Sequence, residues 1–442
     1  MTYRLVVLVT NVWLAHRAGS ETVTRDLALG LLRRGHRPIV YSPALGPPAE
    51  EIAAGGVCVI DDLRQLAETP DIIHAHHSVP CGEALIRFPG TPAIYVCHAF
   101  SSWMEAPVYF PQIGAYVAVD EACRDRLVHT GGIAPEHVVV VHNGVDLRRI
   151  PPRPLPPRAR PERVLAFGKA AAMAEPRIAC ERLGLEYQAL GHRSHRMVAR
   201  PEEELIDFDL VFASARAALE AMCCGCAVVA CDSRGSAGLV TSQNFDRLRA
   251  QNFGVRCLQG TVTVDHCLHE IGRYDPGEAV LVTRRAREEA DFEKVLDRFE
   301  ALYAEVLAGP RRPAVSADAH ARAVAQFLHA YLPRWPGDPR WPWMVEKERL
   351  ASEVHKLVDR IGQLSEQLER VQREARGQSH VSQELENRHA AIQAQLASVT
   401  GERERLGAAL ADVSGQLADL KRSRLLRWGR SLRRLAGLPV PY

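Results

Sequence analysis

Two stretches of the sequence combine a helix start with groups that bind phosphate and sugar hydroxyls. Gly19 stands in the turn Arg-Ala-Gly-Ser-Glu after a Val-rich run, and a glycine there lets backbone N–H groups approach a diphosphate closely. Ser214 is predicted to cap a second helix, on which Arg216 adds positive charge and Glu220 follows. A carboxylate such as Glu220 can accept hydrogen bonds from both vicinal hydroxyls of a ribose. Together these residues predict a nucleoside diphosphate site.

Two cations extend this prediction. Lys169 follows a strand-like run ending at Phe167 through a glycine, which places an ammonium at the carboxyl edge of a sheet. Neutralisation of a phosphate and a solvated loop lysine both fit this position, and the residues alone leave the choice open. Arg177 is a second candidate cation of the same site.

Alternating apolar runs and amphipathic segments position the first of these residues. Residues 3–148 place short Val/Ile-rich runs between helical segments, and continuous apolar strands separated by helices predict a parallel sheet covered on both faces. The predicted strands lie at 5–9, 38–41, 71–74, 93–97, 116–119 and 138–141, with a helix at 21–34. We therefore expect a Rossmann-like domain at 1–148.

A second alternation follows a linker. Residues 149–162 are too rich in proline for a helix or a central strand, and predicted strands then lie at 164–167, 187–190, 210–213 and 228–231. The sequence therefore predicts an α/β protein with two Rossmann-like domains, 1–148 and 163–310, that face each other across a cleft. Ligands are expected at the carboxyl ends of the strands.

The C-terminal part has a different organisation. Residues 311–344 are predicted to form a helix and a Trp/Pro linker, and 345–420 a long α-helical coiled coil. Between 350 and 420 a 4,3 spacing selects twenty-one positions, of which seventeen are apolar. Such a seam needs a partner strand, so we expect self-association. The polar stretch at 377–382 is predicted to be its weakest part.

The last segment, 421–442, holds seven Lys or Arg residues and no acid. As a helix it would align Leu425, Trp428, Leu432 and Leu435 in one stripe among arginines. We hypothesise that 421–436 lies on an anionic membrane surface, which would make the protein cytoplasmic and peripheral at the inner membrane face. Binding of an acidic partner or of nucleic acid is the alternative, and nucleic acid is the less expected partner.

The cysteines and the N-terminus favour the same compartment. Eleven scattered cysteines suit a reducing cytoplasm, and the Cys223 to Cys226 spacing lies in an apolar run where core packing explains it better than zinc. No apolar run approaches the roughly 20 residues that span a bilayer. The apolar start at 3–11 fits a buried first strand better than a signal peptide.

Two further patterns could indicate a metal. Asp207 and Asp209 have the spacing of a D-x-D metal site, but a junction between a helix and a strand explains them better. His74, His76 and His77 alternate along a strand, so at most two could share an ion, and a polar wall is the favoured interpretation. No metal is expected.

Ordered motifs over roughly 3–310 resemble the nucleotide-sugar glycosyltransferases of group 1, or family 4, which have the GT-B fold. The turn at 17–21 with Leu-Gly-Leu-Leu-Arg-Arg-Gly-His at 29–36 resembles the family's Gly-rich turn and first helix. Asp-Ile-Ile-His-Ala-His-His at 71–77 and Tyr-Val-Cys-His at 95–98 resemble later strand ends. The runs at 117–127, 139–146 and 218–229 resemble the end of the first domain and the donor helix.

The resemblance implies roles for these residues. Gly19 and Lys169 would contact the diphosphate, Glu220 the ribose and His98 the reacting sugar, with Ser20, Glu21 and His76 on the acceptor side. Arg177, Ser214 and Arg216 complete the implied donor side. The family uses no metal and no cofactor, and most members retain anomeric configuration.

Two positions depart from the family. Phe212 stands where a glutamate reads the donor sugar, and Ala-Ala-Ala-Met-Ala at 170–174 replaces an expected Lys-Gly pair. We therefore expect a hexosyltransferase-type enzyme that moves a sugar to a polysaccharide or lipid-linked glycan, by a retaining and metal-independent reaction. The alternative is a catalytically degenerate scaffold with a coiled-coil spacer in a surface-glycan assembly complex.

Overall fold

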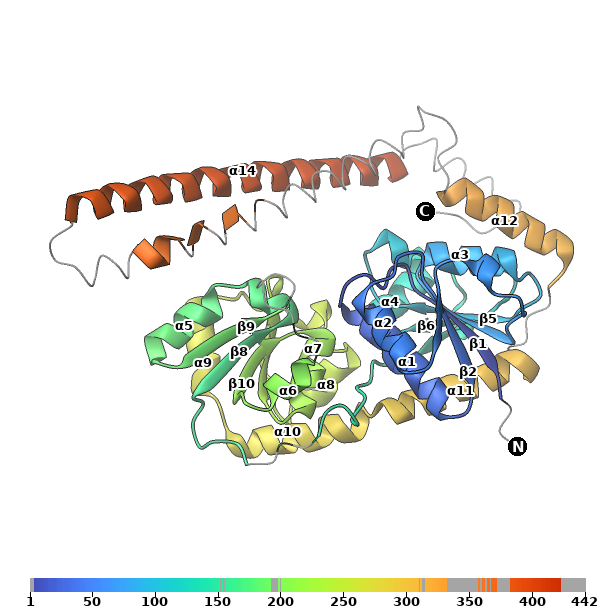
Figure 1. Ribbon diagram of the computed structural model, residues 1–442, viewed down its shortest axis with the longest axis horizontal. Coiled ribbons are helices and arrows are strands. Elements are labelled where there is room, and N and C mark those ends of the chain that lie inside the picture. The colour runs from blue at the N-terminus through green and yellow to red at the C-terminus, as the bar shows by residue number, and fades with distance from the viewer. Residues whose placement is uncertain are drawn as a thin grey trace. The chain divides into compact units, whose positions relative to one another are not determined.

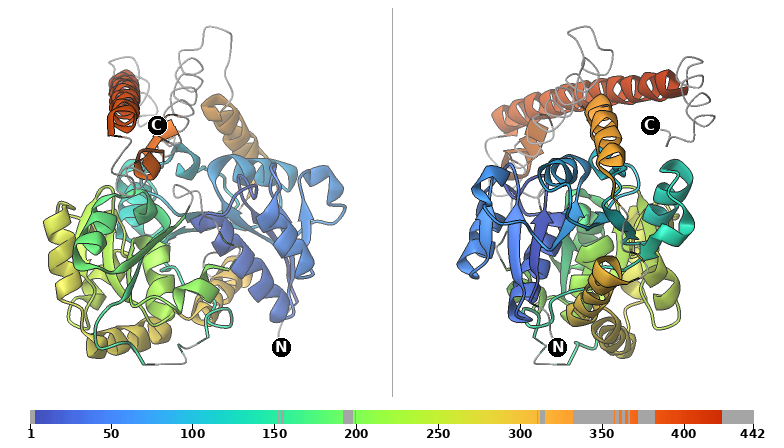
Figure 2. Two further views of the ribbon diagram at one scale, coloured as in Figure 1. Left: turned by 60° about the vertical axis from the view of Figure 1, so that its left-hand side comes forward. Right: turned by 90° about the vertical axis from the view of Figure 1, so that its right-hand side faces the viewer.

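The computed structural model describes residues 4–331, except 152, 154–155, 192–197, 199, 310 and 312–314, then scattered helical positions between 357 and 371, and residues 382–422. The chain divides into Met1–Phe327 and Leu328–Tyr442, which are described separately. The first part contains two sheets, each flanked by its own helices (Figures 1 and 2). The predicted α/β class is confirmed.

The first sheet is parallel and has the strand order β3-β2-β1-β4-β5-β6-β7. Its strands are built from continuous apolar runs, as expected for a sheet covered on both faces. The central strand β1 pairs with β2 on one side and with β4 on the other. The strands are β1 (Val6–Thr10), β2 (Arg37–Tyr41), β3 (Cys58–Ile60), β4 (Ile72–His76), β5 (Ala93–Cys97), β6 (Ile113–Ala118) and β7 (Val138–Val140).

Helices connect these strands. The longest helix between these strands is α1 (Gly19–Arg33), which follows β1 and buries Val23, Leu27 and Leu31. The other helical segments are α2 (Pro47–Ala54), α3 (Ser78–Arg87), α4 (Glu121–Asp125) and the short turns η1 (Leu63–Gln65), η2 (Trp103–Glu105), η3 (Arg126–Thr130) and η4 (Pro135–His137).

The second sheet has the order β12-β11-β10-β8-β9, and only its edge strand β12 is antiparallel. Its strands are β8 (Arg163–Phe167), β9 (Glu186–Leu190), β10 (Leu210–Ala213), β11 (Ala227–Asp232) and β12 (Gly235–Leu239). Its helical segments are η5 (Gly168–Ala172), α5 (Glu175–Leu183), α6 (Pro201–Leu205), α7 (Ala215–Cys223), α8 (Phe245–Ala250), η6 (Val255–Cys257), α9 (Val264–Gly272) and α10 (Pro276–Glu289). Cys223, Cys224 and Cys226 are fully buried, which confirms core packing.

The helix α11 (Phe292–Ala308) returns to the first domain (Figure 1). Its Tyr303 hydroxyl lies 2.6 Å from His74 Nδ1, and its Leu296 closes on Gly30 of α1, where a Cβ would lie 2.6 Å from Leu296 Cδ1. This helix falls within the range predicted for the second domain, yet it completes the core of the first. A following helix, α12 (Ala317–Tyr331), places Phe327 against Phe110.

In the second part of the chain, Ser382–Arg422 forms one helix, α14. This agrees with the helical prediction for those residues, while the pairing of a coiled coil is not tested. The polar stretch at 377–381, most of the seam before it and the basic tail beyond 422 lie outside the described residues. None of the helices described is long and apolar enough to cross a membrane.

Candidate functional site

The turn before α1 leaves Gly19 open to approach. The helix begins at Gly19 after an extended Ala18, without a side chain that caps its first turn. A Cβ built on Gly19 would meet no atom within 4 Å, so the space in front of this backbone is unoccupied by the protein. The turn at Gly19 is therefore open to a ligand, and the N–H groups of the first turn have no side-chain cap.

The start of α7 differs from the prediction in one respect. Ser214 precedes the helix but does not cap it, because its hydroxyl donates to Asp232 Oδ2 at 2.7 Å. Burial alone would raise the pKa of Asp232, but hydrogen bonds from Arg234 and Ser214 lower it, so this carboxylate is a strong competing acceptor. The predicted cap is therefore wrong. The N–H of Ala215 instead donates to Phe253 O at 2.8 Å.

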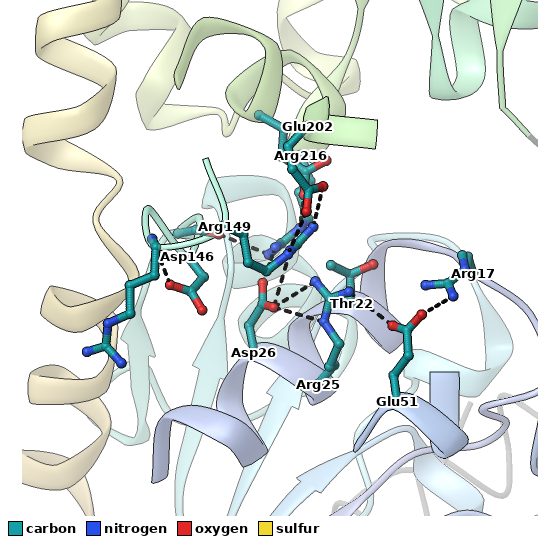
Figure 3. Close-up of polar contacts among 12 residues, drawn as sticks. Arg17, Thr22, Arg25, Asp26, Glu51, Asp146, Arg149, Glu202 and Arg216 are labelled. Carbon is teal, nitrogen blue, oxygen red and sulfur yellow. Dashed lines mark hydrogen bonds and ion pairs between the residues drawn. The ribbon is translucent and has the colours of Figure 1, made fainter. Parts of the chain in front are cut away.

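Arg216 and Glu220 are joined on α7 and reach the first domain. Arg216 Nε lies 3.0 Å from Glu220 Oε1, one helical turn away. Arg216 Nη1 donates to Gly144 O at 2.9 Å, and Nη2 pairs with Asp26 on α1 (Figure 3). The side chains of Arg216 and Glu220 are 7% and 10% exposed. The contact therefore brings α1 and α7 together.

Asp26 is the centre of this contact (Figure 3). It is 1% exposed and accepts from Arg25 at 2.9 Å and from Arg149 at 3.4 Å, besides Arg216. Burial would raise the pKa of Asp26, but the three arginines, with Arg216 first, lower it below its usual range. Asp26 is therefore held as a carboxylate.

Two further acids balance the arginines around Asp26. Arg149 also pairs with Glu202 on α6 at 2.8 Å, and Arg25 with Glu51 on α2 at 3.2 Å. Glu51 in turn binds Arg17 from the turn before α1 (Figure 3). This set, which we call the interdomain charge network, contains four arginines and four acids. Its members are Arg17, Arg25, Asp26, Glu51, Arg149, Glu202, Arg216 and Glu220.

The remaining predicted donor residues lie on other elements. Lys169 is exposed on η5, directly after the left-handed Gly168 (φ 66°) at the carboxyl end of β8. Arg177 lies on the surface of α5 and pairs with Glu181 at 2.7 Å. Phe212 is fully buried within β10, so its side chain cannot face a donor sugar. The structure therefore places Lys169 at a sheet edge and Arg177 on a helix surface.

Four histidines gather at the carboxyl ends of β4 and β5. The rings of His74 and His76 stack with centroids 4.8 Å apart, and those of His76 and His98 with centroids 4.7 Å apart. Burial lowers the pKa of His74 to about 3, of His98 to about 3 and of His77 to about 4. These imidazoles are therefore neutral at neutral pH, which suits a polar wall.

A carboxyl that the sequence did not single out lies among these histidines. Glu105, at the end of η2, accepts from the His98 backbone N–H at 2.9 Å. Its other oxygen lies 3.4 Å from His77 Nε2, while His77 Nδ1 accepts from the Val12 N–H at 3.2 Å. Burial raises the pKa of Glu105 to about 7.

Ser20 and Glu21, predicted on the acceptor side, begin α1 next to this cluster. Glu21 is buried, and its two carboxylate oxygens accept from Trp13 Nε1 and from the Ser20 hydroxyl, each at 3.0 Å. Burial raises the pKa of Glu21, although both hydrogen bonds oppose that shift. Glu21 therefore fixes the indole of Trp13.

The Asp207 and Asp209 pair has a structural role. It lies between α6 and β10, as predicted for a helix-to-strand junction. Asp209 is buried and binds the backbone N–H groups of Glu162 and Arg163 at 3.0 and 3.1 Å, together with Arg153 and Arg158. Within the described residues, no three His, Cys, Asp or Glu side chains are grouped to hold a metal ion.

Comparison with known proteins agrees with the resemblance. Residues 17–149 match the model of Glycosyltransferase Family 4. The first domain has a glycosyltransferase fold. This match covers Gly19, Asp26, the histidines and Glu105. No curated protein matches the chain.

Solved structures show a distant likeness to the chain. A glycosyltransferase from Rickettsia africae is 14% identical with a TM-score of 0.47, and the match covers 70% of this chain and 100% of that one. The pneumococcal O-GlcNAc transferase, solved with UDP and GlcNAc, is 7% identical with a TM-score of 0.47 over 70% of this chain and 100% of that one.

Proposed function

We propose that the chain transfers a sugar from a nucleotide-sugar donor to a glycan acceptor. The observation that carries the proposal is the ion pair between Arg216 on α7 and Asp26 on α1. It joins the helix that bears Glu220 to the helix that begins at Gly19, about 10 Å along α1 from Asp26 at 1.5 Å per residue. This contact between the two helices supports a donor site shared by both domains.

The roles follow from the chemistry of each group. Glu220 accepts from the ribose hydroxyls, and Arg216 orients its carboxylate through Nε. The N–H groups at Gly19 and the ammonium of Lys169 stabilise the negative charge that develops on the departing diphosphate. His98, Ser20, Glu21 and His76 belong to the acceptor side. The acceptor is a polysaccharide or lipid-linked glycan, and transfer is retaining and independent of metal.

Self-association and membrane attachment are part of the same proposal. The apolar seam that includes α14 pairs with a second strand, and the basic residues 421–436 hold the protein at an anionic membrane surface. Both place an enzyme that acts on lipid-linked glycans beside its acceptor.

One observation favours a second candidate function. Phe212 is fully buried, so the glutamate loop that would read the donor sugar has no counterpart at that position. A domain that keeps the fold but no longer binds a donor would serve as a scaffold. Nucleotide binding separates the two functions.

The test compares two buried, ion-paired glutamates of the interdomain charge network. Thermal unfolding is measured with UDP, GDP, ADP and their sugars for the wild type, Glu220→Gln and Glu202→Gln. A ligand at 100 times its Kd stabilises the folded state by about 2.7 kcal/mol. We expect one nucleotide to stabilise the wild type and Glu202→Gln but not Glu220→Gln. A well-folded wild type that no nucleotide stabilises would establish the scaffold instead.

A further inference from the structure

Large apolar side chains are exposed together at the carboxyl edge of the first sheet. Trp13 is 46% exposed, Leu45 42%, Phe100 44% and Trp103 43%. Trp13, Phe100 and Trp103 are the only strongly exposed Trp and Phe side chains in the described part of the protein. We call these four residues the apolar rim. The other strongly exposed large apolar residues described, Leu183, Val280, Leu281, Val315 and Leu328, are aliphatic and lie on or beside α5, α10 and α12.

Contacts between neighbouring loops bring the rim together. Its members follow β1, β2 and β5, and these strands lie with β4 in the order β2-β1-β4-β5. Leu14 pairs with Leu45, which joins the first two loops. His77, after β4, accepts from Val12 and lies against Glu105, which joins the loop of Trp13 to that of Trp103. The loops that carry the rim are therefore neighbours.

The Trp13 ring and the backbone that carries Phe100 are held in place by hydrogen bonds. The indole of Trp13 donates to the buried Glu21 carboxylate at 3.0 Å. Arg126 donates to Ala99 O and to Ser102 O, both at 2.6 Å, and so fixes the backbone on either side of Phe100. A rigid aromatic side chain binds a ligand without an entropic cost of ordering. Monomeric proteins rarely leave such a surface exposed without a partner.

We propose that the apolar rim binds the acceptor, and that the acceptor presents a saccharide ring there. This rests on the proposed function. A pyranose has an apolar C–H face that packs on an indole and hydroxyl edges that need polar partners. The rim provides both, because the partly exposed side chains of Ser20 and His98 lie beside it.

The surrounding charge favours a saccharide over a phospholipid surface. A lipid headgroup layer attracts exposed basic side chains. The arginines beside the rim are engaged within the protein: Arg17 pairs with Glu51, and Arg126 binds loop carbonyls. The partly exposed polar groups beside the rim are instead the uncharged hydroxyl of Ser20 and the imidazole of His98.

The experiment uses the full-length protein and saturation-transfer NMR with a panel of methyl glycosides of glucose, galactose, mannose, N-acetylglucosamine and N-acetylgalactosamine. We expect at least one glycoside to bind, and Trp13→Ala to weaken it by about fivefold or more. Trp13→Phe keeps a ring and should retain most of the binding. Leu183→Ala removes an equally exposed apolar side chain from α5 and should change nothing. Trp103→Ala repeats the test on the second loop.

The outcomes separate this inference from the proposed function. The nucleotide panel is run on the same samples. Nucleotide stabilisation without any glycoside signal overturns the inference alone, and so does a Trp13→Ala variant that binds glycosides like Leu183→Ala. A Trp13→Ala variant that loses partition to phosphatidylcholine/phosphatidylglycerol vesicles, with glycoside binding unchanged, would assign the rim to a lipid surface. Failure of both nucleotides and glycosides removes the proposed function as well.

Discussion

The buried histidines predict that the protein loses stability at mildly acid pH. His74, His76 and His77 are at most 4% exposed, and burial lowers the pKa of all three. In the unfolded chain each would titrate near pH 6.5. Their contribution to stability is therefore present above pH 6.5 and is lost as the pH falls toward the folded values. At pH 5.5 each histidine lowers the free energy of unfolding by about 1.4 kcal/mol, and the three together lower it by about 4 kcal/mol.

Glu105 opposes this loss. Its pKa is raised by burial from 4.5 to about 7, so its protonated form favours folding. That contribution is fully present below pH 4.5 and is lost as the pH rises through about 7. Lowering the pH from 7.5 to 5.5 therefore restores about 2 kcal/mol, and the net loss for the wild type is about 2 kcal/mol from these four groups.

The variant Glu105→Gln isolates the contribution of Glu105 to the pH dependence of stability, because a carboxamide does not titrate. Chemical denaturation at pH 7.5 and 5.5 should show that the variant loses about 2 kcal/mol more stability than the wild type over this interval. Glu136→Gln, which removes a carboxylate from an exposed position, is the control. Parallel losses in the wild type and Glu105→Gln would refute the assignment of a raised pKa to Glu105.

Two substitutions in the expected donor site should differ strongly in their effect on stability. Arg216→Met leaves Asp26 and Glu220 buried with fewer partners and should destabilise the fold by about 3–5 kcal/mol in urea unfolding, whereas the double variant with Asp26→Asn should recover part of that loss. Gly19→Ala should leave the unfolding temperature almost unchanged, because its Cβ meets no atom within 4 Å, but should weaken nucleoside diphosphate binding in calorimetry. Unchanged affinity in Gly19→Ala would exclude close approach of a phosphate at this turn.

The fold could be predicted where strand formation depends on apolar runs. The predicted limits of β5 and β10 agree with the structure to the residue, because each is a short apolar run that is fully buried. The edge strand β12 was missed. Its sequence, Gly-Ser-Ala-Gly-Leu, has little strand propensity, and its place depends on antiparallel pairing with β11 and on Ser236 bonding to Gly260.

The site was predicted less completely, since its geometry depends on contacts between distant segments. Arg216 and Glu220 could be found from their helical spacing, but Asp26, 190 residues from Arg216, could not. The one available signal was a charge within the apolar face of α1, beside Leu27. Glu105 gave no signal, because it acts from a turn in an irregular loop. The cap at Ser214 failed because Asp232 comes from another strand.

The interdomain charge network helps to determine the position of α1 relative to α7. Five of the eight charged side chains are buried, and burying them offers little net stability, because the desolvation of each ion offsets its attraction to a partner. Specific hydrogen bonds nevertheless favour one arrangement of α1 against α7, since a shift would break the ion pair between Arg216 and Asp26 while both side chains stay buried. A purely apolar contact would tolerate such a shift. The orientation of Glu220 therefore depends on a carboxylate in the first domain, so the expected nucleotide site is specified by both domains and not by the second alone.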